Sequence, residues 1–286
     1  MRFGDALKER LGELTRARRA GAGAPDAVPA PAAAAFGAPR AATATAAPPA
    51  QAGVEAYLPG GEWRDPRGAV FVHERLRSEL ERPKPNWGRL GDAAERDPAV
   101  AALAATGLER ALFLDLETGG LQSSPVFLAG TMHWNGEDFV LRQYFARHYG
   151  EEATLLAAVN EQARGFEYLV TFNGRSYDAP FLGGRAVIHG VPLALPPQHL
   201  DLLHAARRRW KRVLPDCKLQ TLERHLCRRR RSGDVPGEEV PGLYHDFVRS
   251  GDPYRLVPVF HHNLLDVITM AEILRALTDD REPRGW

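Results

Sequence analysis

The sequence predicts one α/β domain built on a mixed sheet, because strand patterns come first along the chain and then alternate with helical patterns. Apolar runs at 111–114, 126–134 and 138–145 predict three strands, and Gly136 provides a tight turn between the last two. We expect these strands to form an antiparallel meander. The predicted domain covers 108–280, since a chain of 286 residues has room for one core of roughly 150–200 residues.

The alternation of strand and helix begins after the meander. A helical pattern covers 151–164, and the apolar run at 168–172 predicts a short strand behind it. Further helical patterns recur toward the end of the domain, at 178–189, 202–212, 218–228, 241–250 and 263–277. The prediction is therefore a sheet with an antiparallel meander and additional parallel strands, flanked by helices.

Two segments of unusual composition precede the domain. Residues 1–20 carry Phe3, Leu7, Leu11 and Leu14 at near-helical spacing, which predicts a short amphipathic helix that either frays or docks onto a protein partner. The segment 21–53 is rich in Ala and Pro, a mixture that offers too little varied apolar surface to order a chain and whose prolines interrupt helices. We expect a disordered linker there.

The extension at 54–107 carries the signal of a β-hairpin. Glu62-Trp63-Arg64 and Ala69-Val70-Phe71-Val72 flank the turn sequence Asp65-Pro66-Arg67-Gly68. The residues of this extension indicate no chemistry of their own.

The charge of the chain is small in total and uneven along the sequence. A formal net charge of +1 argues against a protein coated in nucleic acid. From Asp201 to Val235, however, eleven Lys and Arg stand against four Asp and Glu, so that +11 − 4 = +7. We expect one local basic face.

Cysteine content and hydropathy indicate the compartment. Cys217 and Cys227 are too few for a disulfide framework, and with His204 and His225 they match no usual zinc-ligand spacing. No run approaches the ~18 apolar residues that cross a bilayer, and the first residues lack a secretory apolar segment. The expectation is a cytoplasmic protein with reduced thiols and no membrane partner.

Four carboxylates stand in or beside apolar runs, where an isolated charge is expensive to bury. Asp115 and Glu117 are two positions apart on a predicted strand, so they project from the same face near its C-terminal end. Asp178 opens a helix just after a strand, and Asp266 lies within an apolar helix. Each of the first three, taken alone, fits an ordinary surface or helix-start residue, but Asp266 is harder to explain in that way.

Together the four acids have the arrangement that two hard cations ~3.5–4 Å apart require. Such a pair promotes phosphodiester hydrolysis, because one ion lowers the pKa of an attacking water and the other stabilises the leaving oxyanion. A histidine could accept the proton of the water. His262 lies one helical turn before Asp266 and shares its face, whereas His261 points the same way only if the helix has a non-helical start.

Three segments, in this order, resemble the exonuclease motifs of the DEDD (DnaQ-like) superfamily. They are Phe113-Leu114-Asp115-Leu116-Glu117-Thr118-Gly119-Gly120-Leu121, Phe172-Asn173-Gly174 through Asp178-Ala179-Pro180-Phe181-Leu182, and His262-Asn263-Leu264-Leu265-Asp266-Val267. The resemblance covers about residues 108–278 and is nearest to the bacterial YprB-like proteins with a ribonuclease H-like domain.

The resemblance implies a ribonuclease H-like fold and a metal-dependent 3′→5′ exonuclease that hydrolyses single-stranded DNA or RNA. It implies two Mg²⁺ or Mn²⁺ ions held by Asp115, Glu117, Asp178 and Asp266. The alternative is a ribonuclease H-like module that binds nucleic acid and has lost catalysis. The presence of all four acids favours the enzyme.

Two histidines are candidates for the general base. One DEDD class has a histidine five residues before the last aspartate, the position of His261, and the other has a tyrosine four before, the position of His262. The His-Asn pair resembles the YprB-like branch, and His262 shares a helix face with Asp266. We therefore prefer His262 and keep His261 as the alternative.

Two basic runs, at 207–212 and 228–231, and several motif residues are candidates for nucleic-acid contact. A charge run is normally a solvated face, but a metal site for phosphodiesters favours binding of phosphates, with Trp210 stacking on a base. The expected contacts are Thr118, Asn173, Tyr177, Arg207, Arg208, Trp210, Lys211, Arg228, Arg229 and Arg230. Asp201, which follows a predicted strand, either caps a helix or supports the metal site.

Overall fold

The computed structural model describes residues 53–81, 87, 90–91, 96–121, 123–231, 233–279 and 283. The predicted helix at 1–20 and all but the last residue of the linker at 21–53 lie outside these residues. The described residues all belong to one compact unit, Ala52–Trp286.

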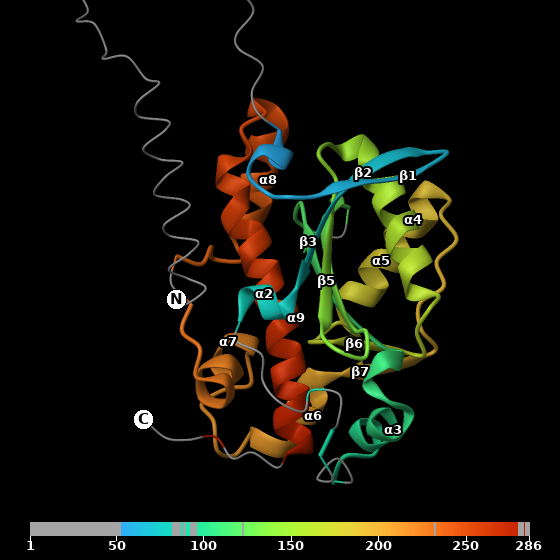
Figure 1. The fold of residues 1–286 in the computed structure, drawn as a ribbon. Helices are drawn as coiled ribbons and strands as arrows, with labels where there is room; N and C mark the ends of the chain where they lie inside the picture. The colour runs from blue at the N-terminus through green and yellow to red at the C-terminus, as the bar shows by residue number, and fades with distance from the viewer. Residues whose placement is uncertain are drawn as a thin grey trace, which may run out of the picture. The chain divides into compact units, whose positions relative to one another are not determined.

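A seven-stranded sheet in the order β1-β2-β5-β4-β3-β6-β7 forms the centre of the molecule (Figure 1). Its strands are β1 (Gly61–Asp65), β2 (Gly68–Leu76), β3 (Ala111–Thr118), β4 (Val126–Trp134), β5 (Phe139–Phe145), β6 (Tyr168–Thr171) and β7 (Gln198–Asp201). Strands β3, β4 and β5 form the predicted antiparallel meander, and β6 and β7 run parallel to β3. The prediction of a mixed α/β sheet is confirmed.

The extension before the domain contributes two strands to the same sheet. β1 and β2 pair as an antiparallel hairpin with Asp65 opposite Gly68, and β2 then pairs with β5. At the other hairpin, Gly136 has a φ of 104°, a conformation that glycine adopts readily, and the chain turns there from β4 into β5.

Helices cover both faces of the sheet, and further helices lie at its lower end in the view of Figure 1. The longer ones are α3 (Pro98–Thr106), α4 (Glu152–Ala163), α5 (Asp178–His189), α6 (Leu202–Trp210), α8 (Val240–Ser250) and α9 (Val257–Thr278). Short turns of helix are α2 (Arg77–Leu80), α7 (Leu219–Leu222), a π-helical turn (Glu223–Cys227) and 3₁₀ turns at Val54–Ala56, Leu108–Arg110, Tyr149–Glu151 and Pro253–Leu256.

One helix boundary differs from the sequence prediction in a way that matters for the site. α9 begins at Val257, with Pro258 in its first turn, and not at 263. Proline suits this position because the first N–H groups of a helix have no partner within it. His261 and His262 are therefore both helical, and the non-helical start that would turn His261 toward Asp266 is absent.

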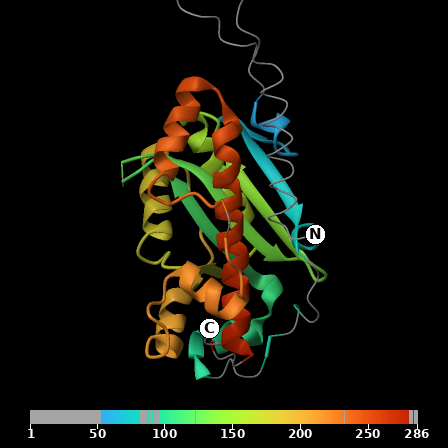
Figure 2. The same cartoon turned by 90° about the vertical axis from the view of Figure 1, so that its left-hand side faces the viewer.

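Two hydrophobic cores lie on opposite faces of the sheet, because neighbouring residues of a strand point to opposite sides. Tyr144 packs in the core under α4 and α5, while Phe145 packs in the core under α8 and α9. Figure 1 shows these helix pairs on either side of the strands, and Figure 2 shows α9 running along the sheet. No helix in the described part of the chain is long and apolar enough to span a bilayer.

Candidate metal centre

The sheet topology brings three of the predicted acids to one edge. β3 and β6 are parallel, so their C-terminal ends lie at the same edge of the sheet. Asp115 and Glu117 are near the end of β3, and Asp178 begins α5 shortly after β6. The backbone N–H of Leu116 donates a 3.1 Å hydrogen bond to Oδ1 of Asp178, which ties the start of α5 directly to β3.

Helix α9 closes the site from the other face of β3. Nδ2 of Asn263 donates to Oδ2 of Asp115 at 2.9 Å, and Nε2 of Gln143 on β5 donates to Oδ1 of Asn263 at 2.8 Å. The helix approaches the sheet this closely because Gly130 on β4 lies below it: a Cβ atom there would collide with the Asn263 amide. The orientation of Asp115 thus depends on a glycine and two amides.

Asp266 lies one helical turn after His262 on α9. Nε2 of His262 is 3.4 Å from Oδ2 of Asp266, and Nδ1 of His262 is 2.9 Å from Oδ1 of Asp234. Asp234 thereby fixes the plane of the imidazole ring. His261 precedes it by one helical position and so leaves the helix about 100° away from the direction of His262.

Burial and mutual repulsion leave the four acids poorly compensated. Burial, together with the carboxylates of Asp266 and Glu117, raises the pKa of Asp115 well above its usual range. Burial also raises the pKa of Glu117 to about 8, although His262 opposes the shift. It raises the pKa of Asp178 to about 7, against two backbone N–H groups, and raises the pKa of Asp266 against Arg231. A divalent cation would relieve this excess of negative charge.

The two histidines have opposite environments. Burial alone lowers the pKa of His262, but its hydrogen bond to Asp234 and the carboxylates of Asp266 and Glu117 outweigh this effect and raise the pKa to about 9. Burial lowers the pKa of His261 to about 4. His262 is therefore the histidine that responds to the charge of the acidic site.

The donor set fits hard divalent cations, although the side chains do not yet surround one point. Among the described residues, no three His, Cys, Asp or Glu side chains form a ready group for an ion. Asn263 holds Asp115, the Leu116 N–H holds Asp178, and Arg231 forms an ion pair with Asp266. All four ligands are nevertheless carboxylates, which Mg²⁺ and Mn²⁺ prefer.

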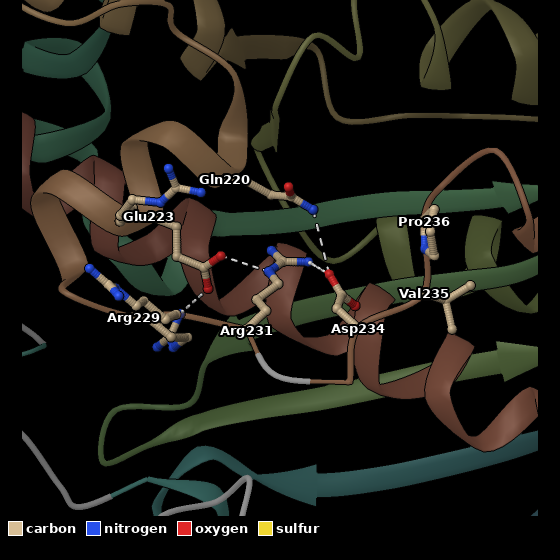
Figure 3. A pocket seen from close by; sticks show the side chains of 9 residues that line it. Gln220, Glu223, Arg229, Arg231, Asp234, Val235 and Pro236 are labelled. Atoms are coloured by element: carbon tan, nitrogen blue, oxygen red, sulfur yellow. Dashed lines mark hydrogen bonds and ion pairs between the residues drawn. The ribbon is translucent and has the colours of Figure 1, made fainter.

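A groove of about 620 Å³, here called the arginine groove, opens beside Asp266 (Figure 3). Its lining consists of Gln220, Glu223, Arg224, Arg229, Arg230, Arg231, Asp234, Val235 and Pro236. The side chains of the predicted basic run at 228–231 point in two different directions here. Arg228 has a left-handed φ of 55° and ends the π-helical turn, after which the side chains alternate: Arg228 and Arg230 are exposed, and Arg229 and Arg231 point inward.

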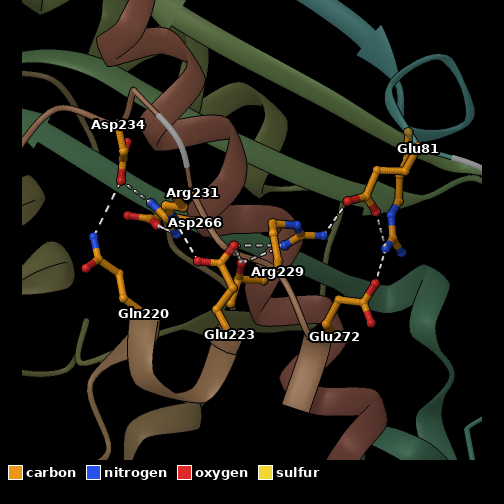
Figure 4. Close-up of polar contacts among 10 residues, drawn as sticks. Glu81, Gln220, Glu223, Arg229, Arg231, Asp234, Asp266 and Glu272 are labelled. Carbon is orange, nitrogen blue, oxygen red and sulfur yellow. Dashed lines mark hydrogen bonds and ion pairs between the residues drawn. The ribbon is translucent and has the colours of Figure 1, made fainter. Parts of the chain in front are cut away.

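Arg229 and Arg231 belong to a chain of ion pairs, here called the ion-pair network, that runs along α9 to α2 (Figure 4). Nε of Arg231 is 2.6 Å from Oε2 of Glu223, and Nη1 of Arg229 is 3.1 Å from Oε1 of the same side chain. Arg229 also pairs with Glu81, which pairs in turn with Arg77, and Arg77 pairs with Glu272. The positive charges of three arginines thereby balance the negative charges of three glutamates.

The structure corrects two of the expected nucleic-acid contacts. Trp210 is fully buried at the end of α6, so neither face of its ring is open to a base. Arg229 is committed to Glu81 and Glu223, and its Nη1 also donates to Oγ1 of Thr269 at 3.0 Å. Both residues follow arginines in the sequence, and only the fold shows which members of a basic run point inward.

The other expected contacts lie on or near the surface. Arg207, Lys211, Arg228 and Arg230 are exposed, and so is Arg208, which forms an ion pair with Asp97. Tyr177, just before α5, has 67% of its surface exposed. The remaining motif residues have local structural roles: Oγ1 of Thr118 donates to the Gly120 carbonyl at 2.9 Å, and Asn173 adopts a left-handed φ of 65°.

Asp201 caps a helix, which is one of the two roles that the sequence suggested for it. Its side chain caps α6 by accepting a hydrogen bond from the Leu203 N–H at 3.0 Å, so the capping prediction is confirmed. It also accepts hydrogen bonds from the N–H groups of Asn173 at 2.8 Å and Arg175 at 3.1 Å. Asp201 therefore holds the turn that leads to Asp178.

Comparison with known proteins places this fold in a family. The model of the RNase H superfamily matches residues 112–278, which are more than half of the chain and include all four acids. The chain belongs to the RNase H superfamily. Nucleases of this superfamily generally use divalent metals such as Mg²⁺, and the superfamily fold is one that processes nucleic acids.

Among curated relatives, this RNase H-like chain is 30% identical over 203 residues to the uncharacterised protein YprB of Bacillus subtilis (strain 168), which makes it YprB-like. The match covers 68% of this chain and 47% of YprB, so the chain spans about half the length of that relative. Among solved structures, the family B DNA polymerase of the hyperthermophilic archaeon Pyrobaculum calidifontis superposes with a TM-score of 0.48 at 19% identity, over 58% of this chain and 24% of the polymerase chain.

Sequence reasoning missed three residues around the acids. Asn263 was visible as a polar residue in an apolar helix three positions before Asp266, and that position was the available signal for its hydrogen bond to Asp115. Arg231 was the last member of a basic run, and Asp234 lay in a loop. No local pattern indicates that these two would meet Asp266 and His262, because the contacts arise from the packing of the loop on α9.

Proposed function

We propose that this RNase H-like chain is a metal-dependent 3′→5′ exonuclease that hydrolyses the phosphodiester bonds of single-stranded DNA or RNA by a two-metal mechanism. The observation that carries the proposal is the gathering of Asp115, Glu117, Asp178 and Asp266 from β3, α5 and α9 into one partly buried site in which the pKa values of all four acids are raised. Such an excess of buried negative charge suits divalent cations. The 3′→5′ direction rests on the resemblance of the three motifs.

The four carboxylates would hold two Mg²⁺ or Mn²⁺ ions, which supply an activated water and stabilise the leaving oxyanion when bound. Asn263 and the Leu116 N–H orient Asp115 and Asp178 for this task. These hydrogen bonds fix the orientation of two of the carboxylates, and the four side chains must still converge when a cation binds.

His262 is the proposed proton acceptor, with His261 as the alternative. Its Nε2 faces Asp266, and Asp234 holds the opposite ring nitrogen. The hydrogen bond to Asp234 raises its pKa most, and Asp266 and Glu117, which would hold the cations, raise it further. Neutralising Asp266 and Glu117 removes part of the cause of the shift and brings His262 toward the range in which it can accept a proton.

Exposed basic side chains are the proposed contacts for the strand: Arg207, Arg208, Lys211, Arg228 and Arg230, with Tyr177 near Asp178 as a stacking partner. Binding of a protein partner by residues 1–20 and a cytoplasmic location stay predictions from the sequence.

The test is hydrolysis of decanucleotides, one labelled at the 5′ end and one at the 3′ end, with Mg²⁺ or Mn²⁺ and in both DNA and RNA form. A 3′→5′ exonuclease shortens the 5′-labelled strand stepwise and releases the 3′ label at once. Asp115→Asn and Asp266→Asn should each lower the rate by about 10²–10³-fold or more. Asp246→Asn, at an acid on α8 that pairs with Arg249, is the matched control and should hydrolyse like the wild type.

Two outcomes would contradict the proposal. Undiminished hydrolysis in both Asp115→Asn and Asp266→Asn would place the reaction elsewhere. Binding of the strand without hydrolysis under any metal condition would favour the alternative, a ribonuclease H-like module that binds nucleic acid without cleaving it.

A further inference from the structure

The arginine groove has the charge and size of a ligand site. Four arginines and two acids line it; Arg229 and Arg231 are also paired with Glu81 and Asp266 outside the lining, so its exposed positive charge lies at Arg224 and Arg230. Its volume of about 620 Å³ falls within the ~300–1,000 Å³ that is usual for such sites. Arg224 and Arg230 are the exposed members at its rim, and Arg231, with a side chain only 6% exposed, is at its inner end. Arginine binds phosphate oxygens with two parallel hydrogen bonds, which makes an anion the expected occupant.

The groove and the acidic site share two side chains. Asp234 lines the groove and also accepts the hydrogen bond of His262. Arg231 lines the groove and also forms the ion pair with Asp266. Its guanidinium is held on two further sides, by Nε to Glu223 at 2.6 Å and by Nη1 to Oδ2 of Asp234 at 3.2 Å (Figure 4). An anion in the groove therefore meets the same guanidinium that holds a proposed metal ligand.

We propose that the arginine groove binds backbone phosphates of a single-stranded nucleic acid, and that Arg231 couples this binding to the acidic site by exchanging Asp266 for a phosphate. The role of Asp266 as a metal ligand rests on the proposed function, whereas the groove is defined by its lining residues alone. A phosphate competes with Asp266 for the guanidinium, and the released carboxylate becomes available to a cation. Because coupling between two sites is reciprocal, the strand and the cation should each strengthen the binding of the other.

The first test measures binding to the groove without metal. Fluorescein-labelled decathymidylate and decauridylate are titrated in EDTA and followed by fluorescence anisotropy. The double variant Arg224→Ala/Arg230→Ala should bind about tenfold more weakly. The slope of its log affinity against log salt concentration should be less steep than that of the wild type by about two units. Arg249→Ala/Arg255→Ala removes the same charge from exposed side chains outside the groove and should change the affinity by no more than about twofold.

Equal affinities of the groove variant and the wild type would overturn the proposed site, as would equal weakening by the control pair. The two oligonucleotides separate DNA from RNA as the source of the phosphates. Because no metal is present, this test does not depend on hydrolysis. Equal affinities of the groove variant and the wild type, together with hydrolysis by the wild type, would refute the groove alone. Weaker binding by the groove variant, together with no hydrolysis by the wild type under any metal condition, would refute the proposed function alone.

The second test measures the coupling through Arg231. Free Mn²⁺ is followed by electron paramagnetic resonance, with and without a decathymidylate whose phosphorothioate linkages resist hydrolysis, and with the oligonucleotide alone as a blank. The wild type should bind Mn²⁺ at least about fivefold more tightly when the oligonucleotide is present. Arg231→Gln should bind Mn²⁺ more tightly than the wild type without the oligonucleotide, and the added strand should then have no further effect.

The sign of the Arg231→Gln effect decides between two roles. If Arg231 serves only to hold the loop against α9, its removal loosens the site and Mn²⁺ binds more weakly, which would overturn the proposal. Arg231→Lys keeps the cation and should restore most of the coupling, and circular dichroism melting of each variant shows whether it is folded at the temperature of the titration.

Discussion

The acidic site and the ion-pair network lie along the same helix, and both place charged side chains away from water. In the ion-pair network, Arg77, Arg229 and Arg231 offset Glu81, Glu223 and Glu272, and Glu223 has a side chain only 2% exposed. In the acidic site, Asp115, Glu117 and Asp178 have no such arginine within the described residues, and their pKa values are raised. Burial of charge therefore does not by itself indicate a functional site, whereas an excess of one sign of charge marks a candidate.

This difference assigns different tasks to the two regions. A balanced network holds α9, the π-helical turn and α2 in one arrangement, and removal of any member leaves a partner buried without its counter-charge. In the unbalanced cluster the carboxylates repel one another, and under the proposed function a cation would relieve this repulsion. Arg231 belongs to both regions, since it pairs with Glu223 on one side and with Asp266 on the other.

The largest effect is expected for the histidine of the acidic site. His262→Ala should lower the rate of hydrolysis by about 10²–10⁴-fold, the usual contribution of a general base. His261→Ala, one position earlier on the same helix, is the matched variant and should lose far less, because His261 points in another direction. Single-turnover rates at saturating metal give the comparison. A greater loss in His261→Ala would reassign the proton acceptor.

A change within the ion-pair network should affect stability and leave chemistry alone. Glu272→Gln removes one of the two acidic partners of Arg77, whose side chain is 5% exposed, and leaves Glu81, so the unfolding free energy should fall by about 1.5–3 kcal/mol. Hydrolysis per folded molecule should stay at the wild-type value. Urea unfolding monitored by circular dichroism and an activity assay at low temperature measure the two quantities. A loss of activity with unchanged stability would show that the two regions are not separate in function.

The contact between α9 and the sheet can be disturbed at one glycine. Gly130→Ala places a methyl group against the Asn263 amide, so the unfolding free energy should fall by about 1–3 kcal/mol and Asp115 should lose its orientation. Gly184→Ala is the control, because it lies on α5 with open space around it and should be neutral or slightly stabilising. Thermal melting and metal affinity of both variants test this prediction, and equal melting of the two would contradict it.

The fold and the acids were predictable from sequence to the extent that local patterns determine them. Strand alternation placed Asp115 and Glu117 on one face, and the strand-turn-helix pattern placed Asp178 at the start of α5. The predicted start of this helix at 263 is wrong, because α9 begins at Val257 and Pro258 suits the first turn of a helix.

The partners of the acids could not be predicted in this way, because they come from distant parts of the chain. Arg231 is 35 residues from Asp266, and Asn263 is 148 residues from Asp115. The burial of Trp210 likewise depends on tertiary packing, since a tryptophan between arginines fits an exposed stacking residue equally well in the sequence. Long-range contacts of this kind leave no periodicity to recognise.

A smaller effect is expected for the pH dependence of stability in EDTA. The folded-state pKa values of Glu117 and Asp178 are raised to about 8 and about 7, so between about pH 4 and pH 8 the unfolded chain binds fewer protons there than the folded chain. Their contribution to stability is present below pH 4 and is lost as the pH rises toward 8. The melting temperature should therefore fall from pH 6 to pH 8.5, and less steeply in Asp178→Asn. A rise over this range, equally steep in wild type and variant, would contradict the assignment of these shifts.

The most direct test of the central claim is the number of Mn²⁺ ions that the chain binds, measured by isothermal titration calorimetry at pH 7.5 without nucleic acid. Two ions per wild-type chain are expected from a two-metal site. Asp115→Asn should lose at least one of them, while Glu272→Gln should keep both as long as it is folded. Equal Mn²⁺ binding by Asp115→Asn and the wild type, or no binding by the wild type at millimolar Mn²⁺, would contradict the account of the acidic site.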